Sequence, residues 1–170
     1  MLKNKIREAF TIIEVVLVLA IAGLIFLMVF IALPALQRSQ RNTAYRNNVA
    51  IAASLARDYA ANNRGRLPTY TGASPMRVGQ NIGEDHPFYS YVQNSNLPEN
   101  TSVKVLDHGN VGVERDQLHL TVGRLMIMAN AECYENSKSF EGQLGVRKQG
   151  AMAVWTILEE GDGMVYCQDV

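Results

Sequence analysis

The clearest feature in the pattern of hydrophobic and polar positions along this chain is a long apolar run near the N-terminus. Residues 15–36 are 22 positions without a charge, and at about 1.5 Å per residue a helix of this length spans the hydrocarbon core of a bilayer. A signal peptide has a shorter apolar region, of about 7 to 15 residues, followed by a small-residue cleavage site. The sequence LPALQRSQR at the end of this run offers no such site. The pattern therefore predicts a membrane-spanning helix.

The helical pattern continues beyond the apolar run. Between residues 37 and 63, apolar side chains recur at steps of four and three and form one stripe of an amphipathic helix. The stripe consists of Tyr45, Val49, Ala52, Ala56 and Tyr59, with Leu55 beside it. Pro34 lacks the N–H that would bond to the Phe30 carbonyl, so we expect the helix to kink or loosen there without ending. Gly65 and Pro68 then predict its end.

The rest of the chain changes from a loop pattern to strand patterns. Residues 67–100 are rich in Gly, Pro, Ser, Asn and Tyr, which predicts an irregular connecting loop with a short helical turn at 87–93. Residues 101–170 contain apolar and β-branched segments, from which we expect an antiparallel sheet of about four strands. The segments are 101–107, 117–122, 124–131, 151–160 and 163–170. One sheet face can pack on the helical stripe, so the predicted fold class is α+β.

The composition fits one domain behind one membrane anchor. The 170 residues include 16 basic and 16 acidic side chains, a balance that gives no global positive field for binding nucleic acid. Charges flank the apolar run on both sides and do not set its orientation. Cys133 and Cys167 suggest one disulfide if the domain is exported, or two buried thiols if it is cytosolic. The long downstream domain and this cysteine pair favour export.

One carboxylate, Glu14, lies at the start of the apolar run. A charged group in lipid costs a few kcal/mol, and less near the interface, so a residue kept at such a place suggests a function. The alternative is a carboxylate that reaches the membrane interface and has no partner.

Other candidate sites carry weaker signals. The histidines are His86, His108 and His119, and their spacing predicts no metal site. We expect the turn EEGDG to be a hairpin rather than a calcium site, and Phe88, Tyr89 and Tyr91 to pack on the sheet rather than bind a ligand. Arg64 and Arg66 could contact DNA phosphates, but a solvated helix end explains them better. No catalytic motif occurs, so we expect neither an enzyme nor a cofactor.

The N-terminal sequence resembles that of type IV prepilins. A short basic leader precedes AFTIIEVVLVLAIAG, and a long helix, a loop and a sheet with a late cysteine pair follow. The resemblance implies that a prepilin peptidase removes residues 1–9 by cutting between Ala9 and Phe10, and that Phe10 is then N-methylated. It also implies that Glu14 is the assembly glutamate, which neutralises the Phe10 amine of a neighbouring subunit and sets the register between subunits. Ala9 stands where this family usually has Gly.

The same resemblance implies the type IV pilin fold and its division of the chain. Residues 10–36 would form a transmembrane and polymerisation helix, and residues 37–170 an exported globular domain. Cys133 and Cys167 would form a disulfide that bounds the C-terminal part of the sheet, 101–170.

Gly23 and Pro34 would mark the part of the helix that loosens when a filament assembles. The alternatives are a small-residue packing contact at Gly23 and a simple kink at Pro34. Pro34 lies nearly a turn farther from Gly23 than in the commonest pilins, so the loosened span would differ slightly.

The expected function is that of a structural subunit. The chain would wait in the membrane with its C-terminal domain outside the cytoplasm, and then polymerise with copies of itself into a surface filament for adhesion, motility or DNA uptake. Its other partners would be prepilin peptidase, the pilus assembly platform and motor proteins, and the lipid bilayer before assembly. The nearest alternative is a pseudopilin of a type II secretion system. The alternative from another class is a monomeric membrane-anchored binding or sensor domain.

Overall fold

A computed structural model gives the fold and describes residues 10–69, 75–107, 121–133, 146–159 and 164–170; the predicted leader, 1–9, lies outside the described residues. The chain divides into two compact units, with the boundary between Ser39 and Gln40. Its elements are α1 (Ile12–Asn62), β1 (Met76–Arg77), α2 (Tyr89–Gln93), β2 (Ser102–Asp107), β3 (Leu125–Glu132), β4 (Val146–Ile157) and β5 (Val165–Asp169). A long helix followed by a sheet confirms the predicted α+β class.

The predicted long helix is confirmed as α1, which has 51 residues and includes Pro34. Proline removes one backbone hydrogen bond, and the helix continues because the bonds of the neighbouring turns remain. The helix ends in the segment that the sequence predicts. Gly65 has a φ of 77°, and its N–H donates to the Ala60 carbonyl at 2.8 Å. Glycine reaches this left-handed conformation without a Cβ penalty, and it therefore caps the helix.

Within the described residues the sheet has five strands in the order β1-β2-β3-β4-β5, one more than predicted. β2 and β3 run parallel, while all other neighbours are antiparallel, so the prediction of an antiparallel sheet is wrong for this pair. The alternation of side chains identifies a strand but does not give its direction relative to a neighbour. Residues 108–124, which are 17 in number, connect β2 to β3. This is long enough for the crossover of about a dozen residues that a parallel pair requires.

In the segment 67–100, which the sequence predicts to be a loop, the described residues form two elements. α2 confirms the predicted helical turn, whereas β1 is an additional strand of two residues. The strand predicted at 117–122 falls mostly outside the described residues, and its last two residues, Thr121 and Val122, form no strand. β4 begins at Val146, five residues before the predicted start at 151.

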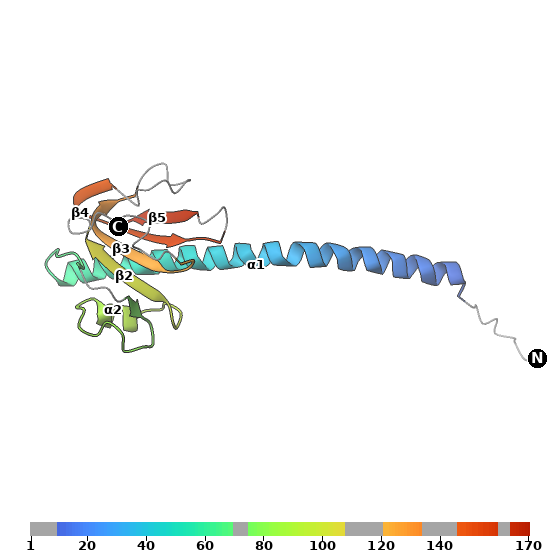
Figure 1. The fold of residues 1–170 in the computed structure, drawn as a ribbon, viewed down its shortest axis with the longest axis horizontal. Helices are drawn as coiled ribbons and strands as arrows, with labels where there is room; N and C mark the ends of the chain where they lie inside the picture. The colour runs from blue at the N-terminus through green and yellow to red at the C-terminus, as the bar shows by residue number, and fades with distance from the viewer. Residues whose placement is uncertain (1–9, 70–74, 108–120, 134–145, 160–163) are drawn as a thin grey trace, which may run out of the picture. The chain divides into compact units, whose positions relative to one another are not determined.

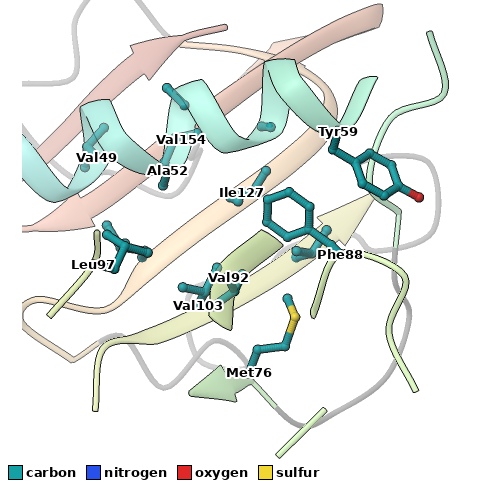
Figure 2. Packing of buried hydrophobic residues seen from close by; sticks show 14 of the residues in the cluster. Val49, Ala52, Tyr59, Met76, Phe88, Val92, Leu97, Val103, Ile127 and Val154 are labelled. Atoms are coloured by element: carbon teal, nitrogen blue, oxygen red, sulfur yellow. The ribbon is translucent and has the colours of Figure 1, made fainter. Parts of the chain in front are cut away.

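The part of α1 that follows Gln40 covers one face of the sheet (Figure 1). The predicted stripe is largely confirmed, because all of its members are buried except Tyr45, which is half-buried. Side chains from α1, the segment around α2 and the sheet meet in this core (Figure 2). The sheet contributes Val103, Val105, Leu125, Ile127, Met152 and Val154.

A second buried cluster lies on the opposite face of the sheet. It consists of Leu106, Met126, Met128, Ala131, Ala153 and Trp155, with Cys133, Val165 and Cys167 partly buried against it. β3 contributes to both clusters because successive side chains of a strand point to opposite faces. Burial on both faces explains why this strand has a nearly continuous apolar sequence.

Candidate functional site

The apolar half of α1 is not covered by any described part of the chain. From Ile12 to Leu36 every residue is exposed except Ala22, which is half-buried, and the exposed fraction is still 75% at Phe30, well inside the helix. Soluble monomers rarely expose so large a continuous apolar surface, which is typical of contact with lipid or with another protein. Within the described residues, α1 is also the one helix that is long and apolar enough to cross a membrane.

Glu14 has a hydrogen-bond partner within its own chain. The Thr11 backbone N–H donates to Glu14 Oε2 at 2.9 Å, and the Thr11 hydroxyl donates to the same oxygen at 2.8 Å. The Glu14 N–H lies 3.4 Å from the Thr11 hydroxyl oxygen. Thr11 directly precedes the helix and Glu14 is its third residue, so the pair forms a capping box that satisfies backbone donors at the start of α1.

The capping box changes the interpretation of Glu14. The sequence suggests either a partner on a neighbouring subunit or no partner at all, and the structure adds a partner within the same chain. The spacing Thr-x-x-Glu directly before an apolar helix is the signal that predicts a capping box, and it is present in the sequence.

Phe10 and Glu14 lie on the same side of the helix start. Together with Val15, Val18 and Leu19 they line a shallow apolar depression along α1. The spacing of these residues follows the helical repeat, so they form one face. Phe10 itself is 86% exposed and precedes the helix. The structure thus brings together Phe10, which the resemblance assigns to cleavage and N-methylation, and Glu14, which it assigns to assembly. Ala9 lies outside the described residues.

Gly23 and Pro34 both lie within the continuous helix. A Cβ built on Gly23 would meet no atom within 4 Å among the described residues, so Gly23 makes no small-residue packing contact within this part of its own chain. Loosening of the helix between these residues remains a prediction.

Cys133 and Cys167 are 34 positions apart in sequence and form a disulfide, with Cα atoms 5.9 Å apart. Cys133 directly follows β3 and Cys167 is the third residue of β5, so the enclosed chain includes β4 and the first two residues of β5. The Cys133 N–H also donates to Asp169 Oδ1 at 2.6 Å. The predicted pairing is therefore confirmed, and the alternative of two free thiols is wrong.

A polar cluster joins α1 to the end of β4. Arg41 Nε lies 2.8 and 2.9 Å from the two carboxylate oxygens of Glu159, and the Tyr45 hydroxyl lies 3.4 Å from the first of them. The Glu159 N–H donates to Oδ1 of the buried Asn42 at 2.8 Å. The hydrogen bond that Arg41 donates to the Glu159 carboxylate raises the pKa of Arg41, and burial raises the pKa of Tyr45. These contacts fix the helix against the end of β4, and the sequence did not predict them.

His86 and the aromatic group have structural roles, while His108 and His119 lie outside the described residues. His86 is buried, and its Nδ1 accepts the Phe88 N–H at 2.9 Å. Phe88 is fully buried and stacks on Tyr91 with ring centroids 5.8 Å apart, while Tyr59 meets both rings edge-on. Packing of this aromatic group is thus confirmed. Across the described residues no group of three metal-ligand side chains occurs, and EEGDG lies outside them after Glu159.

No protein-family model, curated protein or solved structure matches this chain. The fold and the exposed segment nevertheless define a class of protein. It is an α+β domain with one disulfide, behind an N-terminal helix that is long and apolar enough to span a membrane. An anchored monomer and a subunit that polymerises through its anchor both belong to this class, because each must cover the same apolar helix.

Proposed function

We propose that this chain is a type IV pilin, a subunit that waits in the membrane and polymerises through α1 into a surface filament. The observation that carries the proposal is the start of α1, where an exposed apolar helix begins with Phe10 and holds the Glu14 carboxylate on the same side. Neighbouring helices in a filament would cover the surface that lipid covers before assembly. The disulfide supports an exported domain, because disulfides persist in oxidising compartments.

Cleavage between Ala9 and Phe10 by a prepilin peptidase would give Phe10 a cationic amine in apolar surroundings. A carboxylate of a neighbouring subunit within a few ångströms stabilises such a charge strongly at low dielectric. Both Thr11 bonds to the Glu14 carboxylate use Oε2. A carboxylate has about four acceptor positions, so Glu14 can accept the amine of a neighbour without leaving the capping box. Capping and assembly are therefore compatible.

The capping box also favours a second candidate. If Glu14 serves only to start α1, the protein needs no neighbour, and a monomeric membrane-anchored binding or sensor domain explains the same helix. A pseudopilin of a type II secretion system would, like a pilin, polymerise through its N-terminal helix, and it would use Glu14 in the same way. The test must therefore separate the charge of Glu14 from its role as an acceptor.

Two substitutions make this separation. Glu14→Gln keeps an acceptor at the third helical position, where Gln also completes a capping box, but it removes the charge. Thr11→Val removes the hydroxyl contacts of the box and keeps the charge, so it is the matched control. A lost ion pair costs a few kcal/mol per subunit, and each 1.4 kcal/mol is about tenfold in an equilibrium constant. We expect Glu14→Gln to abolish long filaments and Thr11→Val to retain them, both at normal membrane levels.

Electron microscopy of sheared surface material measures the filaments, and immunoblotting measures the amount of subunit in the membrane. Filaments that persist in Glu14→Gln at wild-type length would refute the proposed charge pairing. Loss of filaments in both variants to the same extent would instead assign the effect to the helix start.

A further inference from the structure

The strand β1 forms one edge of the sheet, and two of the backbone groups that face outward at this edge are occupied by a side chain. On the inner side, the Val78 N–H donates to the Thr101 carbonyl at 3.1 Å, and the Asn100 N–H donates to the Val78 carbonyl at 3.0 Å. Backbone groups alternate in direction along an extended chain, so those of Arg77 and Gly79 face away from β2. Outward groups of this kind are a template on which another strand can add.

The side chain of Gln93, at the end of α2, binds two of these outward groups, the Gly79 N–H and the Arg77 carbonyl. The Arg77 carbonyl also accepts the Gln80 N–H at 3.2 Å. The Gly79 N–H donates to Gln93 Oε1 at 2.8 Å, and Gln93 Nε2 donates to the Arg77 carbonyl at 2.7 Å and to the Gln80 carbonyl at 3.1 Å. If another strand lay parallel to β1 on this side, the backbone of its residue opposite Val78 would make the same pair of bonds to Arg77 and Gly79. Such a residue donates to the carbonyl before Val78 and accepts from the N–H after it. The carboxamide therefore replaces the backbone of an added strand.

The position of Gln93 is fixed by the packing of α2. Val92, its neighbour in α2, is fully buried in the core. The Tyr89 hydroxyl, from the start of α2, donates to the Gln80 carbonyl at 3.0 Å. Because α2 is fixed by these contacts, the backbone of Gln93 is already in place, and only its side-chain rotamers are ordered when the carboxamide meets β1.

Two other features limit the pairing of another strand with the same edge. Pro75 precedes β1 at an outward position and has no N–H to offer. Gly79 has a φ of 78°, which ends the extended conformation after a strand of only two residues. Short strands and proline are ordinary ways in which proteins prevent pairing at sheet edges.

We propose that Gln93 is a plug for this edge, which stops a second copy of the chain from adding its β5 to β1. β5 is the other end of the five-stranded sheet. Joining β1 of one copy to β5 of the next is a head-to-tail contact that does not close, so it would propagate through many copies. Closing one of the two edges is enough to prevent this. The inference does not depend on whether the chain forms filaments through α1.

The test uses the full-length chain in detergent micelles. Gln93→Leu removes the carboxamide, and Leu has a helix propensity similar to that of Gln. Gln80→Leu is the matched control, because the Gln80 side chain donates to Asn100 Oδ1 at 2.8 Å and its backbone carbonyl is unchanged. Sedimentation over a range of protein concentrations measures association, and hydrogen exchange measures protection of the Gly79 amide. Gln93→Met serves as the second variant if Gln93→Leu does not fold.

We expect Gln93→Leu at low concentration to exchange the Gly79 amide about tenfold faster than the wild type, as loss of one hydrogen bond allows. At high concentration it should form larger species that the wild type and Gln80→Leu do not form, with new protection of β5 amides. Unchanged exchange at Gly79 would overturn the proposal, because the edge would then not be held by Gln93. Fast exchange without association at any concentration would overturn it as well, because an open edge would then not attract β5.

Discussion

Reduction of the Cys133–Cys167 disulfide should lower the free energy of unfolding of the sheet domain by about 3 to 4 kcal/mol. The bond joins residues 34 positions apart. In the chain-entropy model, closing a loop of this length costs the unfolded chain about 13 cal/mol/K, which is close to 4 kcal/mol at 25 °C. The folded state should change little, because both cysteines can stay packed as thiols against the cluster around Trp155. Most of the effect therefore acts on the unfolded chain.

Trp155 is the natural probe for this experiment. It is the single tryptophan of the chain, it is fully buried, and it is paired with Cys167 across β4 and β5. Urea unfolding of the detergent-solubilised chain, with and without a phosphine reductant, compares two forms of identical sequence. At an m-value of about 2 kcal/mol/M, the expected loss lowers the urea midpoint by about 2 M. The m-value should rise on reduction, since the unfolded chain becomes more expanded.

A midpoint shift below about 0.5 M, equivalent to about 1 kcal/mol at that m-value, would refute the entropic reasoning. The double variant Cys133→Ala with Cys167→Ala is the control for incomplete reduction. Its midpoint should fall at least as far as that of the reduced chain, because it loses the crosslink together with two partly buried sulfur atoms.

Two further predictions concern the leader and the histidine in the core. Intact-mass analysis of surface protein should find a chain that begins with N-methylated Phe10, and recovery of chains beginning only at Met1 would contradict the leader prediction. Burial lowers the pKa of His86 below its ordinary value of 6.5. The unfolded chain then binds the proton more readily, so the stability that His86 contributes is complete above about pH 6.5 and is lost as the pH falls below that value. His86→Asn offers an acceptor to the Phe88 N–H without titrating, so its melting temperature should fall less than that of the wild type between about pH 7 and pH 5. If the melting temperatures of the wild type and of His86→Asn fall equally, the loss of stability comes from protonation of carboxylates and not from His86.

The elements that could be predicted from the sequence are those long enough to show a periodic pattern or an apolar run. The stripe on α1 and strands β2 to β5 each contain enough residues to show a repeat or an apolar run. β1 has two residues and shows neither. The direction of β2 relative to β3 depends on a crossover, which leaves no mark on the side chains of either strand.

Contacts between distant residues were the other part that could not be predicted. Asn42 and Glu159 are 117 positions apart, and no local pattern links them. The contacts of Gln93 with β1 depend on how α2 packs, since a glutamine at a helix end has no preferred partner by itself. The disulfide could be predicted because the chain has only two cysteines, which leaves one possible pair.

Glu14 shows why a residue that looks costly in sequence needs both a local and an intermolecular explanation. A carboxylate in an apolar helix suggests a distant positive partner, but two Thr11 donors already satisfy part of its hydrogen-bonding capacity. The two roles need different chemistry, since capping requires an acceptor and neutralising an amine requires a negative charge. A chain whose filaments survive Glu14→Gln uses this residue to begin α1. A chain that loses its filaments while α1 still begins at Ile12 uses the charge to join subunits.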